Sequence, residues 1–90
     1  MEGEENTTEA ARKMIAVDVS PTAADAIRHK FNPSDRGDVA SIKDLTGTLI
    51  TMLERIRDRD GGKAGREAAV AITNIQTASM WAVLAATKGL

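Results

Sequence analysis

The sequence predicts an all-α protein: an antiparallel helical hairpin, preceded by short N-terminal helices and assembled as a compact homo-oligomer. Only 2% of the residues are aromatic, so a core must be built from aliphatic side chains, which favours helix packing over sheets. Apolar residues recur at spacings of three and four over residues 39–58, and a second apolar segment covers residues 66–88. A short glycine-containing connection between them predicts an antiparallel return. We expect residues 1–20 to be a partly helical extension and residues 21–90 to be the hairpin domain.

The first element expected is a helix within the N-terminal extension. Asn6 or Thr7 is a suitable N-cap, and Glu9 is placed as the reciprocal partner in a capping box. Apolar residues continue from this cap to Val17. The pattern therefore predicts a helix that ends near Val17.

A second, shorter helix is expected directly before the hairpin. Ser20 followed by Pro21 is a cap and first-turn signature, and it predicts a helix from Pro21 to about His29. The side chains expected on its inner side are Ala24, Ile27 and Phe31. Residues 31–38 contain Pro, Gly, Asn and Asp, which favour turns, so they predict a loop.

The first arm of the hairpin is an amphipathic helix over residues 39–58. Its apolar positions are Ile42, Leu45, Thr46, Leu49, Ile50, Met52, Leu53 and Ile56. They cover an arc of about 160°, wider than the roughly 100° that a surface helix needs, so we expect contact with more than one neighbour. Arginines in the last turn and the sequence Asp60-Gly61-Gly62 predict a left-handed exit.

The second arm, from Arg66 to about Lys88, has no charged face between Glu67 and Lys88. Trp81 and Leu84 lie away from the side that one partner helix would cover, and burial of each would contribute about 1.5–3 kcal/mol. A helix that is apolar around its whole circumference belongs inside a larger assembly. The sequence therefore predicts self-association.

Composition and charge exclude several classes of partner. Twelve basic and thirteen acidic residues give a net charge of −1, without the basic excess that drives binding to duplex nucleic acid. The acidic N-terminus lacks the features of a secretory signal, and there is no cysteine, so we expect a cytoplasmic protein. Residues 68–87 are uncharged and long enough to span a membrane, but polar side chains interrupt their middle, so we expect no membrane insertion.

No motif in the sequence is typical of an enzyme. His29 is the single histidine; it has neither the carboxylate spacing of a zinc site nor the order of a hydrolytic triad. Residues 61–66 look faintly like a phosphate-binding loop, but they follow a helix instead of a strand and lack the required spacing. We expect no enzymatic activity, no metal and no cofactor.

One cluster of residues suggests a small-molecule site. His29, Phe31 and Asn32 combine an aromatic ring with polar neighbours, and Lys43 borders the apolar arc of the next helix. Phe31 offers a face on which a base can stack, and Lys43 offers a cation for a phosphate. The competing interpretation is structural: Phe31 caps the core and Lys43 is solvated.

A second group of polar residues begins the last helix. Arg66 opposes the helix dipole at its position, which either a ligand phosphate or an ion pair with Asp58, Asp60 or Glu67 would explain. The polar positions that follow are Thr73, Asn74, Gln76 and Thr77. Thr73, Asn74 and Gln76 fit a pocket or, equally, a layer of hydrogen bonds between subunits that fixes the register of an assembly.

These motifs, taken in order, resemble a phage family of helical-hairpin sponges, the anti-CBASS and anti-Thoeris proteins that share one hairpin domain. The similarity covers roughly residues 27–87. It rests on His29-Lys30-Phe31-Asn32-Pro33-Ser34, Ile42-Lys43, Arg66, Ala71-Ile72-Thr73-Asn74-Ile75-Gln76 and Met80-Trp81-Ala82-Val83. The resemblance implies compact homo-oligomers, typically hexamers, which bind cyclic oligonucleotide or cyclic ADP-ribose-type signals and do not degrade them.

The resemblance also implies roles for individual residues. Phe31 matches the aromatic residue that stacks on a base, although relatives often have Tyr there, and Lys43 matches the phosphate-binding lysine. His29 and Asn32 match flanking polar residues of this cyclic dinucleotide pocket. Arg66 and Thr73 are similar to residues of a second pocket that takes cyclic trinucleotides in some members.

The function expected is therefore a phage immune-evasion sponge in the cytoplasm of the infected bacterial host. The hairpin domain would sequester cyclic di- or trinucleotides or cyclic ADP-ribose isomers. The alternative is a structural or protein-interaction hairpin without a nucleotide ligand. A hydrolase of such signals is a third reading, which the missing metal and nucleophile arrangements disfavour.

Overall fold

The computed structural model describes residues 18–90, and in this part of the chain every regular element is helical. The helices are α2 (Pro21–Ile27), α3 (Gly37–Asp58), the short 3-10 turn η1 (Asp60–Gly62) and α4 (Gly65–Ala86). The predicted all-α class is confirmed. The helix predicted between Asn6 or Thr7 and Val17 lies outside the described residues.

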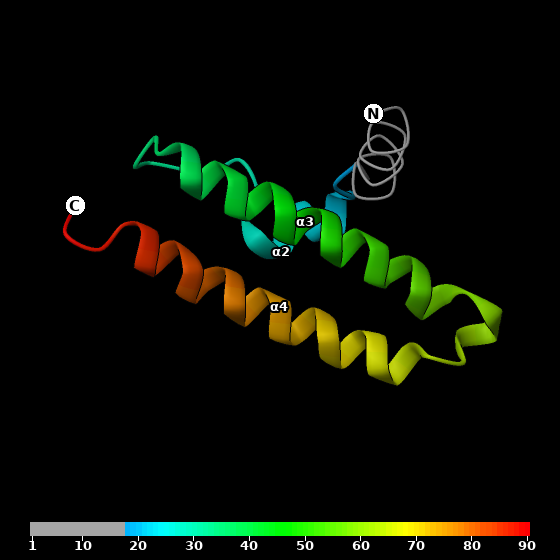
Figure 1. Ribbon diagram of the computed structural model, residues 1–90. Coiled ribbons are helices and arrows are strands. Elements are labelled where there is room, and N and C mark those ends of the chain that lie inside the picture. Colours follow the sequence, from blue (N-terminus) through cyan, green and yellow to red (C-terminus); the bar gives the residue numbers. More distant parts are fainter. Residues whose placement is uncertain (1–17) are drawn as a thin grey trace, which may run out of the picture.

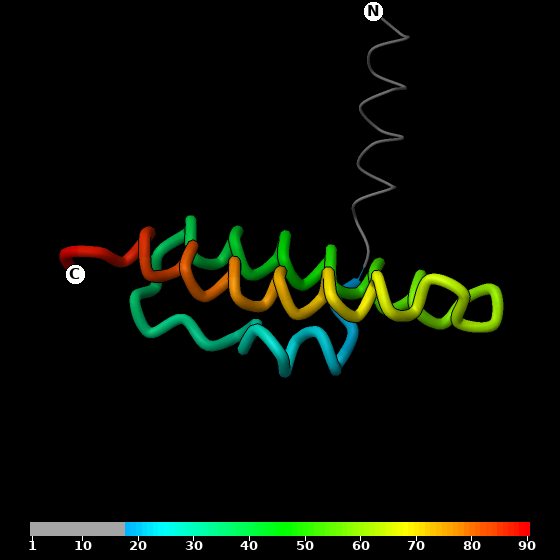
Figure 2. The backbone as a smooth tube through the Cα atoms, turned by 90° about the horizontal axis from the view of Figure 1, so that it is seen from below, coloured from blue at the N-terminus to red at the C-terminus, as the bar shows by residue number. Residues whose placement is uncertain are grey.

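The helices α3 and α4 lie side by side and run antiparallel, joined by η1 at one end (Figure 1). The short helix α2 lies along one side of this pair and contacts both of its members (Figure 2). Among the described residues, no further helix covers the opposite side of the hairpin. The fold therefore has two layers: the hairpin of α3 and α4, and the short helix α2 on one face of it.

Helix α2 begins as the cap signature predicts. The hydroxyl of Ser20 accepts a hydrogen bond from the backbone N–H of Ala23 at 3.1 Å, and Pro21 fills the first turn. The helix ends two residues earlier than predicted, because Arg28 adopts a left-handed conformation with φ 51°. The sequence pattern predicted that Ala24 faces the core. In the structure, Ala23 is the fully buried alanine of α2, and Ala24 is half-buried.

The two long helices also match their predicted ranges closely. Helix α3 starts two residues before Val39, and α4 starts one residue before Arg66 and ends two before Lys88. Between them, Asp60, Gly61 and Gly62 have φ values of 53°, 68° and 80°, which is the predicted left-handed exit. Since glycine adopts such angles without a Cβ clash, the turn reverses the chain at little cost.

The hydrophobic core is small. Ala23, Ile27 and Ile50 are buried at the junction of α2 and α3. Partly buried side chains that pack against them are Val19, Ile72 and Ile75. This core uses only part of the apolar surface of the long helices, since Leu45 of α3 remains 65% exposed. The wide apolar arc predicted for the first arm therefore exceeds what residues 18–90 cover.

Gly47 permits the closest approach between α3 and the segment that leads into α2. A Cβ built at Gly47 would lie 3.0 Å from both methyl carbons of Val19 and 3.1 Å from Cδ1 of Ile27. The segment is also held by polar contacts, since the backbone N–H of Ser20 donates to Oγ1 of Thr51 at 2.9 Å. The close packing at Gly47 and this hydrogen bond together fix the position of α2 along α3.

Substituting leucine for Gly47 is expected to lower the free energy of unfolding by about 1–3 kcal/mol, because the side chain would overpack this contact. Chemical denaturation followed by circular dichroism measures the change. Gly37→Ala is the matched control, since nothing lies within 4 Å of a Cβ built at Gly37. Equal stability of the two variants would contradict the close packing of Val19 on α3.

Candidate functional site

Lys43 is buried, with 5% of its surface exposed, although it is a lysine in the middle of a helix. Its ammonium donates hydrogen bonds to the carbonyl oxygen of Arg28, at 2.8 Å, and to that of Phe31. Burial, and next the positive charge of Arg28, lower the pKa of Lys43. The interpretation of Lys43 as a solvated residue was wrong, because the residue is buried and its ammonium donates to two backbone carbonyls of the turn after α2.

Phe31 lies at the surface, with 56% of it exposed, so the interpretation that it caps the core was wrong. Its backbone N–H donates to the carbonyl of Arg28 at 2.9 Å, which closes the turn. The ring centroid lies 5.5 Å from Nζ of Lys43 and 5.6 Å from Cζ of Arg28. An exposed aromatic ring beside two cations attracts a ligand that is both flat and anionic.

His29 and Asn32 stabilise the surroundings of this turn. Nε2 of His29 lies 2.6 Å from a carboxylate oxygen of Asp44, and the His29 side chain is 13% exposed. Nδ2 of Asn32 donates to the carbonyl of Arg36 at 3.0 Å, and its amide oxygen accepts from Ser34 at 2.7 Å. The structure thus gives both residues partners within the chain, while their contact with a ligand stays a prediction.

A cavity of about 650 Å³ opens between the turn after α2 and the second half of α4. Its lining residues are Ala26, Ile27, Arg28, Phe31, Lys43, Gln76, Ser79, Met80, Val83 and Leu84. The lining combines apolar side chains with two cations and no carboxylate, so it favours an anion that carries an apolar or aromatic part. Phe31 and Lys43, paired by sequence reasoning, meet here; His29 and Asn32 do not line this cavity.

Two residues that line the cavity, Arg28 and Gln76, add to the predicted site. Arg28 was not among the predicted site residues; its position three residues before the aromatic ring was the available signal. The sequence leaves two roles open for Gln76, in a pocket or in a layer that sets the register of subunits, and the structure places it in the cavity wall. Its amide offers both a donor and an acceptor to a base edge.

Arg66 and Thr73 lie outside this cavity, both exposed on α4. They are seven residues apart, so they share one helix face at a separation of about 10 Å. Among residues 18–90, no ion pair forms at Arg66: Asp58 pairs with Arg57, and Asp60 with Arg59. Thr73 donates to the carbonyl of Ala69 at 3.2 Å. The ion-pair explanation for Arg66 finds no support, and its phosphate role remains a prediction.

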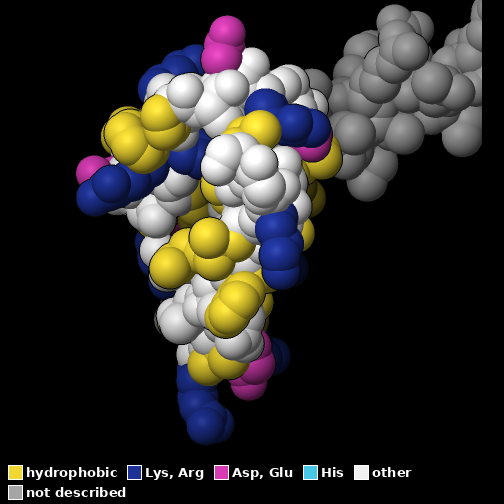
Figure 3. Space-filling view, turned by 90° about the vertical axis from the view of Figure 1, so that its left-hand side faces the viewer, with side chains coloured by type: hydrophobic (Ala, Val, Ile, Leu, Met, Phe, Trp, Pro, Cys, Tyr) yellow, Lys and Arg dark blue, Asp and Glu magenta, His cyan; other side chains and the backbone are white. Residues whose placement is uncertain are grey.

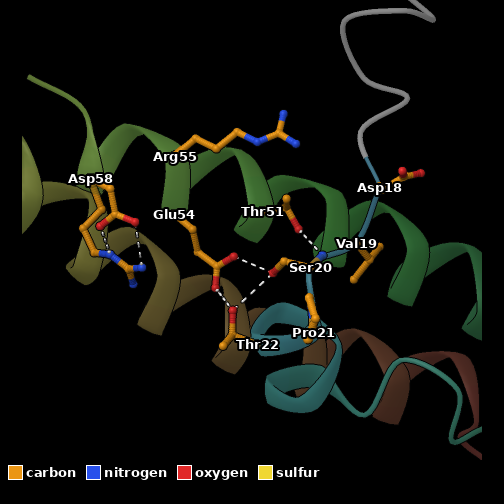
Figure 4. A pocket seen from close by; sticks show the side chains of 10 residues that line it. Asp18, Val19, Ser20, Pro21, Thr22, Thr51, Glu54, Arg55 and Asp58 are labelled. Carbon is orange, nitrogen blue, oxygen red and sulfur yellow. Dashed lines mark hydrogen bonds and ion pairs between the residues drawn. The ribbon is translucent and has the colours of Figure 1, made fainter.

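A second hollow, of about 460 Å³, lies where the segment before α2 meets the end of α3 (Figure 4). Here Glu54 accepts hydrogen bonds from the hydroxyl of Ser20, at 2.5 Å, and from that of Thr22. Both carboxylate oxygens therefore have partners within the chain (Figure 4). The hydrogen bonds of Glu54 at this hollow hold the start of α2 against α3.

Among residues 18–90, nothing covers the outward surface of α4, which combines large apolar side chains with uncharged polar ones. Beyond the first turn of α4, at about 100° per residue, seven exposed side chains fall within an arc of about 120°, which we call the outer stripe; Arg66, in the first turn, lies in line with it. They are Val70, Thr73, Asn74, Thr77, Met80, Trp81 and Leu84. Trp81 and Met80 are each 68% exposed. Figure 3, which views the hairpin from one end, likewise shows apolar side chains at the surface beside basic ones.

By length and composition alone, α4 could cross a membrane, and in the described structure most of the segment is unburied. Core helices of soluble assemblies pass the same test. Threonine hydroxyls along the helix return to backbone carbonyls one turn earlier, as Thr77 does to Thr73 at 3.2 Å. The hydroxyls of Thr73 and Thr77 are therefore satisfied within α4 itself.

Within residues 18–90, no three His, Cys, Asp or Glu side chains gather as they would around a metal ion.

Comparison with protein families matches residues 22–87 to the Acb2/Tad1 hairpin domain. Searches of curated proteins and of solved structures give no match.

Proposed function

This chain belongs to the Acb2/Tad1 hairpin-domain family, the anti-CBASS and anti-Thoeris sponges, and on that premise we propose that it sequesters cyclic nucleotide second messengers. Membership implies sequestration of cyclic nucleotides in general. Our finer proposal is that cyclic di- or trinucleotides, or cyclic ADP-ribose isomers, are bound and released intact. The protein would act for a phage, in the cytoplasm of the infected bacterial host.

The observation that carries the proposal is the composition of the 650 Å³ cavity. The exposed ring of Phe31 supplies a stacking surface, and Arg28 and Lys43 supply positive charge within 6 Å of that ring. A cyclic nucleotide has the complementary parts, a flat base and a phosphate held a short distance from it. Stacking on an aromatic side chain contributes about 1–3 kcal/mol per base, independently of base identity.

We further propose a homo-oligomer, with six subunits as the expected number. Val70, Thr77 and Leu84 repeat at intervals of seven along the outer stripe, a spacing that suits packing against a second helix. Met80 and Leu84 belong both to this stripe and to the cavity wall. A second copy packed on the stripe would therefore border the cavity and shield a bound ligand from water.

Isothermal titration calorimetry against cyclic di-AMP, cyclic di-GMP, cyclic GMP–AMP, cyclic tri-AMP and cyclic ADP-ribose isomers tests the function. We expect saturable binding of at least one compound, and chromatography after heat denaturation is expected to return it unchanged. Absence of binding across the panel would contradict the sponge, and recovery of a cleaved product would indicate a hydrolase. If nothing in the panel binds and a protein partner is captured, the interaction-hairpin alternative is favoured.

A further inference from the structure

We propose that residues 7–15 dock as a helix on the outward side of α3 in their own chain. These residues lie outside the part of the chain that the structure describes. The docking surface is a row of apolar side chains, which we call the α3 stripe: Ile42, Leu45, Leu49, Met52 and Ile56. The inference concerns neither the cavity nor the outer stripe of α4, and it does not depend on a nucleotide ligand.

The α3 stripe is continuous, and its centre is exposed. At about 100° per residue, its five members are the only residues within an arc of about 80° beyond the first turn of α3, so no polar side chain interrupts it. Leu45 is 65% exposed and Leu49 is 40% exposed. The buried residues of α3 lie around the opposite side of the helix: Val39, Lys43, Gly47, Ile50 and Thr51. Among residues 18–90, the packing of α2 and α4 therefore leaves the centre of the stripe uncovered.

The chain enters the described fold beside the middle of α3. The backbone N–H of Ser20 donates to Oγ1 of Thr51 at 2.9 Å, on the side of α3 that faces α2. Asp18 lines the hollow together with Thr51 and Arg55. Figure 4 shows Asp18 and Arg55 in the upper half of the view, with Thr22 of α2 below them. Followed backwards from Ser20 to Asp18, the chain therefore leaves α2 and moves around α3.

The α3 stripe lies within reach of the segment that precedes Asp18. Arg55 and Met52 are three residues apart and so about 60° apart around the helix, which is roughly 5–6 Å along a surface of about 10–12 Å diameter. The three chain steps from Ile15 to Asp18 span up to about 10 Å. Residues 7–15 can therefore lie on the stripe while residues 16 and 17 make the connection.

The sequence of the segment has the complementary pattern. In a helix, its apolar residues would fall within an arc of about 140°, and its charged residues Glu9, Arg12 and Lys13 would fall on the opposite side. The apolar residues are Ala10, Ala11, Met14 and Ile15. Nine helical residues are about 14 Å long, which the stripe accommodates, since Ile42 and Ile56 are about 21 Å apart along α3.

Docking within one chain is favoured over docking on a second copy because the segment is tethered beside the stripe. A short tether gives an effective concentration on the order of millimolar, which a free copy would have to reach in solution. A helix of this length is not stable by itself in water, so it forms only against an apolar surface. The surface beside its point of attachment is the α3 stripe.

Disulfide formation in the full-length chain tests the contact directly, because the wild-type sequence contains no cysteine. Met14→Cys/Leu49→Cys is oxidised with copper phenanthroline and examined by non-reducing electrophoresis and mass spectrometry. We expect a disulfide within one chain, since docking brings the two Cα atoms within about 7 Å. Lys13→Cys/Leu49→Cys is the matched control, and its disulfide should form about 10-fold more slowly, because Lys13 lies on the polar side of the helix. Met14→Cys/Trp81→Cys tests the outer stripe of α4 as the alternative surface.

Trypsin supplies a second test, since Arg12 and Lys13 are cleavage sites inside the segment. Leu45→Glu/Leu49→Glu is expected to accelerate cleavage at these sites by about 10-fold, because the segment is no longer held as a helix. Ala40→Glu/Leu90→Glu is the control: both positions are apolar, exposed and outside the α3 stripe, and cleavage should change less than about 2-fold. Mass spectrometry measures the cleavage rate, and circular dichroism verifies that the hairpin is folded.

Four outcomes would overturn the inference. If the disulfide of Met14→Cys/Leu49→Cys joins two chains, a second copy occupies the stripe. If Met14→Cys/Trp81→Cys forms its disulfide faster than Met14→Cys/Leu49→Cys, the segment covers the outer stripe of α4. Equal rates for the Lys13 and Met14 pairs would indicate random encounter without docking. Cleavage at the same rate in wild type and in Leu45→Glu/Leu49→Glu would show that the stripe does not hold the segment.

Discussion

The double variant Trp81→Glu/Leu84→Glu is expected to be a monomer that keeps its helical content. Both side chains are mostly exposed in the single chain, so neither contributes to the described core. In an assembly, burial of the two would contribute about 3–6 kcal/mol in total, equivalent to a roughly 100- to 10,000-fold difference in association. The added carboxylates would also have to be desolvated without a partner.

Sedimentation velocity measures the assembly mass, and far-ultraviolet circular dichroism measures the helical content. Ser41→Glu/Lys63→Glu is the control, since both positions are exposed and polar and lie outside the outer stripe. We expect the control to sediment as the wild type does. A double stripe variant that sediments like the wild type would show that another surface holds the assembly together.

Replacing Phe31 with alanine is expected to weaken binding of a cyclic dinucleotide by about 5- to 150-fold, the loss that corresponds to one stacked base. The fold should be unaffected, because the ring is 56% exposed and the turn is held by backbone and Lys43 hydrogen bonds. Calorimetry measures the affinity, and a thermal melt verifies the fold.

Two further substitutions of Phe31 distinguish stacking on an aromatic ring from contact with any apolar side chain of similar size. Phe31→Leu retains an apolar side chain without a ring, so its affinity should fall nearly as far as that of Phe31→Ala. Phe31→Tyr keeps the ring and adds only a hydroxyl, so binding should be at least as tight as in the wild type. Equal affinity of the leucine and phenylalanine proteins would exclude stacking as the source of binding energy.

The elements of the fold were predictable where local chemistry determines them. Ser20 and Pro21 define the start of α2 because a capping hydroxyl and a fixed φ act within one turn. Asp60, Gly61 and Gly62 define the reversal because glycine tolerates left-handed angles. Spacings of three and four likewise defined the long α3.

The environment of side chains was less predictable because it depends on contacts between segments. Periodicity alone could not show that the carbonyls of Arg28 and Phe31 would need the ammonium of Lys43, which lies twelve or more residues along the chain. It also placed Ala24 on the inner side of α2, where the structure buries Ala23 fully and Ala24 only partly, because the rotation of a short helix is set by packing. For the same reason, Arg28 was missed as a site residue: its left-handed φ places it beside the ring.

Copies of this chain are expected to assemble through the outer stripe of α4 and to hold an unmodified cyclic nucleotide. Native mass spectrometry with and without cyclic GMP–AMP, and with the other panel compounds, measures both properties at once. We expect a homo-oligomer in both spectra, with added mass equal to whole numbers of intact ligand in the second. A monomer that gains no ligand mass, or a ligand that returns with an altered mass, would contradict it.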